Sequence, residues 1–199
     1  MKEFISTKNH NFTFGNCSNC EAKCCNGRHG TIFSQIILNE FEKVYNNFPI
    51  LFIFGELGFI KPIILLTNGN SFCPYLKDFK CTIYHDRPTV CRTYPLSPNL
   101  DNNIYIDTLC PEINKVGTNI IKDNKINEDF DNSIFYNYQD KYIQTHFEFE
   151  KLKREDFEKV YTINKVEFFK YKGTTDSNYL SMHKKSLKNL SKFLNINQK

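Results

Sequence analysis

The chain has 199 residues, of which 40% are apolar and 15% aromatic, so it can bury a core and does not have the composition of a disordered chain. Its formal net charge of +4 is mild and does not favour nucleic acid as a partner. Its eight cysteines are many for this length, and all of them precede residue 111.

No export or membrane-spanning segment is expected. The first residues lack the apolar stretch of a secretion signal. The longest apolar stretch, residues 48–66, contains Glu56, Lys61 and two prolines, whereas a spanning helix needs about 20 largely uncharged residues. We therefore predict a cytoplasmic protein that does not contact the membrane. In a reducing compartment, many cysteines favour metal ligation over disulfides.

Several elements are predicted in the cysteine-containing part of the chain. Residues 17–30 are polar and contain glycine, so they are expected to form a loop. Strands are expected over residues 32–38, 62–67 and 104–109. A helix is expected over residues 40–46, with Asn39 as its N-cap and Glu42 completing a capping box. Pro88 is expected at the first position of another helix.

The part of the chain after Cys110 contains no cysteine. Apolar residues recur at helical spacing over residues 133–152 and 179–194, and the second stretch has leucines on one face and lysines on the other. We divide the chain into a cysteine-cluster metal-binding domain, residues 12–115, and a mainly helical extension, residues 116–199. The expected fold class is α+β: a small, loop-rich module organised by metal, with a helical C-terminal extension.

The cysteines are the main candidates for function. All eight are predicted metal ligands: Cys17, Cys20, Cys24, Cys25, Cys73, Cys81, Cys91 and Cys110. The spacing Cys-x2-Cys lets one tight turn aim two sulfurs at a single ion. Thiolates are soft ligands, and four around one centre suit Zn²⁺ or an iron–sulfur cluster such as [4Fe-4S].

The adjacent cysteines Cys24 and Cys25 restrict how the ligands are shared. Neighbouring side chains tend to point apart, so one tetrahedral ion rarely takes both. The pair is therefore expected to serve two sites or a polynuclear cluster, or one of the two packs as a small apolar residue.

Roles other than metal ligation fit the cysteines less well. Four disulfides would account for all eight, but they require an oxidising compartment. Scattered buried thiols would not produce the clustered spacing. His29 and His85 lie near cysteines and are alternative ligands for a Cys₃His site. Arg87 is expected either to offset thiolate charge or to pair within the fold. The remaining histidines are expected to face solvent or to pack: His10, His146 and His183.

The order of these residues resembles the CxxCxxCC cysteine-cluster family, often called YkgJ-like. The similarity runs through the first four cysteines, then through residues 72–76, 81–84 and 87–95, and ends at Cys110. One departure is that three residues, not two, precede the Cys24-Cys25 pair, which puts the role of Cys24 in doubt. The resemblance implies chelation of zinc or iron. Some relatives are flagellin lysine N-methylases, and older labels call members Fe–S oxidoreductases.

The leading hypothesis is thus a metal-binding protein that ligates zinc or an iron–sulfur cluster through clustered cysteines. The alternative is an Fe–S enzyme, either an oxidoreductase or a protein lysine N-methylase similar to flagellin methylase, and the sequence leaves open whether the protein is an enzyme. A zinc module that binds nucleic acid is the third hypothesis. The one partner predicted is a metal ion.

Overall fold

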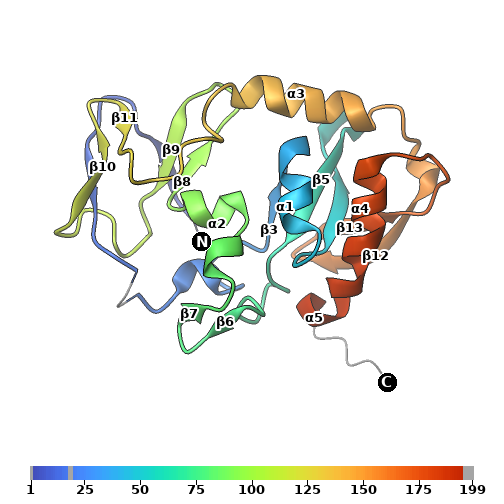
Figure 1. The fold of residues 1–199 in the computed structure, drawn as a ribbon, viewed down its shortest axis with the longest axis horizontal. Helices are drawn as coiled ribbons and strands as arrows, with labels where there is room; N and C mark the ends of the chain where they lie inside the picture. Colours follow the sequence, from blue (N-terminus) through green and yellow to red (C-terminus); the bar gives the residue numbers. More distant parts are fainter. Residues whose placement is uncertain (1, 18–19, 195–199) are drawn as a thin grey trace.

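The computed structural model describes residues 2–17 and 20–194. The fold has two halves, each packed around its own buried apolar cluster (Figure 1). The larger half carries the long strands and the C-terminal helices, and the smaller half carries two three-stranded sheets. The cysteine segments lie where the two halves meet.

The larger half is built on a five-stranded antiparallel sheet in the order β12-β13-β4-β5-β3. Its strands are β3 (Phe33–Gln35), β4 (Ile50–Phe54), β5 (Ile60–Leu65), β12 (Phe157–Ile163) and β13 (Val166–Tyr171). The apolar stretch 48–66 thus forms the centre of the sheet. Consecutive residues Ile50, Leu51 and Phe52 are fully buried. Since successive side chains of a strand point to opposite faces, both faces of β4 are covered.

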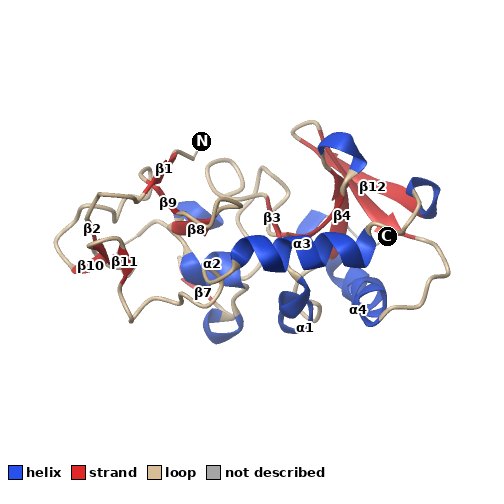
Figure 2. Cartoon of the chain, turned by 90° about the horizontal axis from the view of Figure 1, so that it is seen from above, coloured by secondary structure: helices blue, strands red, loops and turns tan. Residues whose placement is uncertain are grey.

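Helices cover this sheet. They are α1 (Phe41–Val44), α3 (Tyr138–Phe149), α4 (Asn178–Ser186) and α5 (Leu190–Leu194). Seen from above, α3 crosses the middle of the molecule, near α1 (Figure 2). Two polar side chains fix α4 to β4: the Ser186 hydroxyl accepts the Ile50 N–H at 2.9 Å, and the His183 ring contacts the Ile50 carbonyl at 2.7 Å.

The smaller half is built from short strands in two segments of the chain, residues 4–14 and residues 96–126. One sheet has the order β1-β9-β8, and the other has the order β11-β10-β2. Their strands are β1 (Phe4–Ser6), β2 (Phe12–Phe14), β8 (Leu96–Pro98), β9 (Ile104–Asp107), β10 (Thr118–Lys122) and β11 (Lys125–Ile126). Their core includes Ile106, Ile120 and Ile121, all fully buried, together with Cys110.

The structure confirms the α+β class, but the segment after residue 116 is less helical than expected. It contributes the four strands β10–β13 as well as α3, α4 and α5. Across residue 116, β10 pairs with β2 and β13 pairs with β4. The domain boundary there stays a prediction. None of the helices in the described residues is both long and apolar enough to cross a bilayer.

The predicted helix starts need two corrections. Ahead of α1, the carboxylate of Glu40, and not Glu42, accepts the Ile37 N–H at 3.1 Å, so the chain enters this region through the 3₁₀ turn η2 (Leu38–Glu40). In α2 (Thr89–Thr93), Pro88 is the N-cap and not the first helical residue. Its extended backbone, with ψ of 157°, explains the shift.

Candidate metal centre

The first four cysteines lie on an irregular segment that folds back on itself. The Cys20 N–H donates to the Cys17 carbonyl at 3.3 Å, which holds these two residues together. Ala22 then adopts a left-handed backbone, with φ of 52°, and leads into the 3₁₀ turn η1 (Lys23–Cys25). The predicted loop therefore contains one short helical turn, and that turn carries Cys24 and Cys25.

The next two cysteines are brought to this segment by backbone pairing. The Cys73 N–H donates to the Cys25 carbonyl at 2.8 Å, beside an antiparallel bridge between Asn26 and Phe72. The chain then forms a hairpin of β6 (Leu76–Lys77) and β7 (Lys80–Cys81). This pairing places Cys73 and Cys81 at the base of one hairpin.

The last two cysteines come from separate elements. Cys91 lies in α2, where its N–H donates to the Pro88 carbonyl at 2.9 Å. Cys110 follows β9 in a turn closed by its own N–H donating to the Asp107 carbonyl at 3.2 Å, and it is buried. The described cysteines are free thiols, so the structure contains none of the disulfides considered as an alternative.

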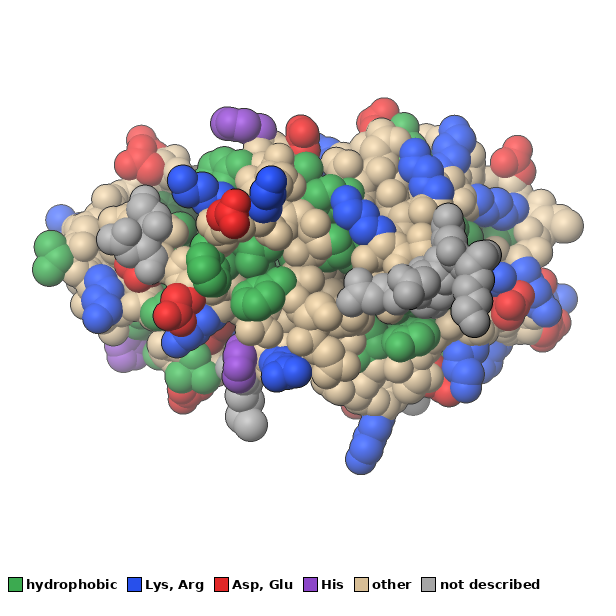
Figure 3. Space-filling model, turned by 90° about the horizontal axis from the view of Figure 1, so that it is seen from below, with side chains coloured by type: hydrophobic (Ala, Val, Ile, Leu, Met, Phe, Trp, Pro, Cys, Tyr) green, Lys and Arg blue, Asp and Glu red, His purple; other side chains and the backbone are tan. Residues whose placement is uncertain are grey.

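Seven of the eight cysteines line one cavity of about 630 Å³. They are Cys17, Cys20, Cys24, Cys25, Cys73, Cys81 and Cys91. The rest of the wall is largely apolar and includes Phe48, Leu66 and Val90. Hydrophobic side chains also gather on the outer face beneath this region, seen from below in Figure 3. Segments up to 74 residues apart in the chain thus converge on one space.

Burial dominates the electrostatics of these thiols. It raises the pKa of Cys73 and of Cys110 to about 11 each, and it raises the pKa of Cys91 still further. Cys24 is the exception: its hydrogen bond with the Cys25 thiol, followed by the charges of Lys2 and Arg87, lowers its pKa to about 7. Most of these thiols therefore stay protonated until a cation compensates their charge.

The thiols influence one another in two groups. Negative charge on Cys17, Cys20 and Cys24 raises the pKa of Cys110. Cys73 and Cys81 raise the pKa of Cys91, and Cys73 and Cys91 raise that of Cys25. Cys24 acts on both groups, since it raises the pKa of Cys17 and that of Cys73.

The sulfurs are gathered but not yet in coordination geometry. In the described residues, no three donors of the kind that bind metals are close enough together to hold an ion. The Cys24 and Cys25 sulfurs are 3.9 Å apart, so these neighbours do not point apart as the sequence led us to expect.

The charged residues near the cysteines play different parts. Arg87 lines the cavity, and its guanidinium stacks 3.6 Å from the centre of the Tyr84 ring, so it pairs within the fold. Its role in offsetting thiolate charge stays a prediction. His29 and His85 are not among the residues that line the cavity. Sequence reasoning missed Lys2, a largely buried ammonium whose charge lowers the pKa of Cys24. It is 15 residues before Cys17, so no local pattern reveals it.

The tip of the β6–β7 hairpin is strained. Asp78 and Phe79 both have positive φ, 49° and 58°, in a two-residue turn where glycine is preferred at the second position. A left-handed conformation costs an L-residue roughly 1–2 kcal/mol. Phe79 is also 60% exposed, so its side chain recovers little of this energy by burial.

Phe79→Gly is accordingly expected to raise the free energy of unfolding by about 1 kcal/mol, measured by urea denaturation. Phe72→Gly is the matched control, because Phe72 is a half-exposed phenylalanine without a positive φ. The control should lower the free energy of unfolding. A decrease for Phe79→Gly as well would show that contacts of the Phe79 ring outweigh the strain of its backbone.

Comparison with known proteins supports metal binding. Residues 16–111 match the model of the CxxCxxCC family, described as a "putative zinc- or iron-chelating domain". No curated protein matches the chain, and no solved structure does. Nothing in these comparisons favours the Fe–S enzyme alternative. The matched segment spans all eight cysteines, so residues 16–111 are identified as a CxxCxxCC domain.

Proposed function

We propose that the protein binds two metal centres, each held by four cysteine thiolates. The observation that carries this proposal is the convergence of seven cysteines on one cavity, with the eighth electrostatically coupled to them. Eight sulfurs are the number that two tetrahedral zinc ions or two four-thiolate iron–sulfur centres require.

The eight cysteines divide into two sets of four, according to the chain segments that carry them. One centre would take the N-terminal turn and the residue after β9: Cys17, Cys20, Cys24 and Cys110. The other would take η1, the hairpin and α2: Cys25, Cys73, Cys81 and Cys91. The division follows the backbone contact between Cys25 and Cys73 and the two groups of mutually coupled thiols. Since the Cys24 and Cys25 sulfurs are 3.9 Å apart, the two centres would be neighbours.

The donor set fits zinc or iron. Thiolates are the softest ligands that proteins offer, and a cation recovers the energy that buried thiols lose on ionisation. Four thiolates leave a zinc ion no open position for a substrate, which favours a structural or cargo role for the metal. With a charge of −2 on each zinc centre, the chain's formal net charge of +4 would fall to about zero.

Anaerobic purification followed by elemental analysis tests the proposal. We expect either about two zinc atoms per chain in a colourless protein, or iron with inorganic sulfide in a brown one. A folded protein that contains neither metal, and takes up neither when reduced and reloaded, would contradict it. The same preparation distinguishes zinc from iron.

Arg87 is expected to support both centres. Its charge lowers the pKa of Cys17, Cys24 and Cys91, so it stabilises their thiolates. Arg87→Met should weaken metal affinity about tenfold in a competition with a chelator, as is typical when a group that supports metal ligands is removed. Arg28→Met is the control, because Arg28 is near the first cysteines in sequence but does not line the cavity. Equal affinities would contradict this role.

A further inference from the structure

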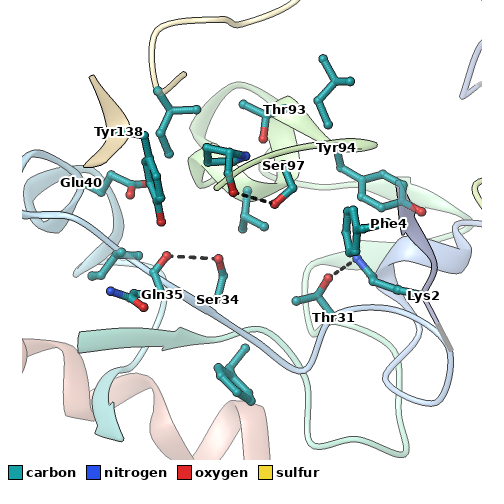
Figure 4. A pocket seen from close by; sticks show the side chains of 16 residues that line it. Lys2, Phe4, Thr31, Ser34, Gln35, Glu40, Thr93, Tyr94, Ser97 and Tyr138 are labelled. Carbon is teal, nitrogen blue, oxygen red and sulfur yellow. Dashed lines mark hydrogen bonds between the residues drawn. The ribbon is translucent and has the colours of Figure 1, made fainter. Parts of the chain in front are cut away.

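A second pocket, of about 300 Å³, lies between the two halves of the molecule (Figure 4). It is separate from the cysteine cavity but shares the side chains of Thr31, Val90 and Tyr94 with it. All the residues of β3 and all those of β8 line it. Because successive side chains of a strand point to opposite faces, such a lining means that the pocket follows the edges of both strands.

The edge of β3 that faces away from β5 has free backbone groups. In the pairing with β5, the Ile36 N–H donates to the Pro62 carbonyl, and the Ile32 carbonyl accepts the Leu66 N–H. In an antiparallel pair, only every second residue of a strand bonds to the partner strand. The backbone groups of Phe33 and Gln35 therefore point away from β5. The hydrogen bonds found in the described part of the chain give neither of these N–H groups a partner.

The edge of β8 is free in the same way. The Asp107 N–H donates to the Pro95 carbonyl, and Ser97 lies opposite Tyr105 in β9. The backbone groups of Leu96 therefore point away from β9, and the described residues supply no partner for its N–H. The pocket thus has two unpaired strand edges in its wall.

One end of the pocket carries an acidic side chain and the other end carries a basic one. Beyond the end of β3, the buried carboxyl of Glu40 lies beside Tyr138. Before the start of β3, the Lys2 ammonium donates to the Thr31 hydroxyl. Figure 4 shows these two pairs on opposite sides of the pocket. An elongated ligand with a cation at one end and an anion at the other would match this arrangement.

We propose that this pocket binds a short extended peptide, which adds as a strand to the free edges of β3 and β8. Strand addition uses the main-chain groups of a sheet edge. Here the edge N–H groups are free, while the Gln35 and Pro98 carbonyls accept the hydroxyls of Ser34 and Ser97, which a bound strand would displace. A basic side chain of the peptide would face Glu40, and an acidic side chain or terminal carboxylate would face Lys2. This inference goes beyond metal binding and does not depend on it.

Fluorescence polarisation with two labelled pentapeptides tests the proposal on the protein as purified. The peptides are Lys-Val-Thr-Val-Glu and the reverse sequence, because the direction of the added strand is open. One of them should bind saturably. Methylation of its central backbone nitrogens, which removes N–H donors without changing the protein, should weaken binding at least tenfold. Replacing its Lys and Glu by Gln should also weaken binding.

Protein variants test the polarity of the pocket. Lys2→Met and Glu40→Gln should each weaken binding at least tenfold, and Gln keeps an oxygen that can accept the Ile37 N–H. Lys8→Met, at an exposed lysine outside the pocket, should bind as the wild type does. The proposal is overturned if neither peptide saturates, if the N-methylated peptide binds equally well, or if 6-aminohexanoate binds and the peptides do not. The last result would assign the pocket to a small zwitterion.

Discussion

Cys91→Ser and Cys20→Ser are each expected to remove one of the two metal centres and to leave the other in place. Cys91 belongs to the proposed group with the hairpin cysteines, and Cys20 belongs to the group with Cys110. A serine hydroxyl is a much poorer ligand for zinc or iron than a thiolate. Elemental analysis should therefore find about half the wild-type metal in each variant and almost none when both changes are combined.

The two variants should also destabilise different parts of the molecule. The free energy of binding a structural zinc ion is about 10–16 kcal/mol in zinc-finger peptides, so losing one centre should cost several kcal/mol of local stability. Cys91→Ser should increase amide exchange in the β6–β7 hairpin and in α2. Cys20→Ser should increase it around η1 and in the turn that holds Cys110, because those segments share the other centre.

A cavity residue that is not a thiol provides the control. Thr31→Ser changes the wall of the cavity but keeps the hydroxyl, so it should retain the full metal content. If either cysteine variant alone lost all of the metal, the eight cysteines would hold one polynuclear cluster and the division into two groups would be wrong. If both variants kept the wild-type metal content and stability, these cysteines would not be ligands.

The convergence of the cysteines could be predicted from the sequence, because the ability to ligate a soft metal depends on the residue type more than on the local backbone geometry. The spacing of Cys17 and Cys20 indicated that the two residues lie close together, and the Cys20 N–H does donate to the Cys17 carbonyl. The sequence could not assign partners to Cys24 and Cys25, since the orientation of their side chains depends on the left-handed backbone at Ala22. A positive φ at an alanine has no reliable sequence signature.

The hairpin of β12 and β13 shows where periodicity alone fell short. The turn between these strands is Asn164-Lys165, with both residues at positive φ. Asn is a common turn residue, but glycine usually follows it in a hairpin and lysine does not. The burial of β13 does not alternate cleanly, since the neighbours Phe168 and Phe169 are buried and half-buried. Tertiary contacts, and not local pattern, decide this element.

The position of His183 illustrates the same limit and leads to the second large expected effect. Its sequence neighbours are mostly polar, yet the ring is fully buried between α4 and β4. Nδ1 is 2.7 Å from the Ile50 carbonyl, and Nε2 accepts the Tyr171 N–H at 3.0 Å. The carbonyl can only accept and the N–H can only donate, so the ring must be neutral with its proton on Nδ1.

Protonation of His183 should therefore destabilise the fold. Burial lowers its pKa to about 4 from the ordinary value of 6.5. Because the folded-state pKa is the lower one, the stabilisation is complete above pH 6.5 and is lost as the pH falls towards 4. The shift corresponds to about 3 kcal/mol in total, of which about 2 kcal/mol should be lost between about pH 7.5 and pH 5.

His183→Leu separates this effect from other acid-sensitive groups, including the metal centres. It leaves the Ile50 carbonyl and the Tyr171 N–H unpaired, so it should lower the free energy of unfolding at about pH 7.5 by about 2–4 kcal/mol. As the pH falls to about 5, the difference between wild type and variant should shrink by about 2 kcal/mol, because only the wild type retains the titrating ring. His146→Leu, at a partly exposed histidine in α3, is the matched control and should leave that pH dependence unchanged. A wild-type-to-variant difference that stays constant with pH would mean that His183 titrates alike in the folded and unfolded chains, and that its two backbone hydrogen bonds do not hold the ring neutral.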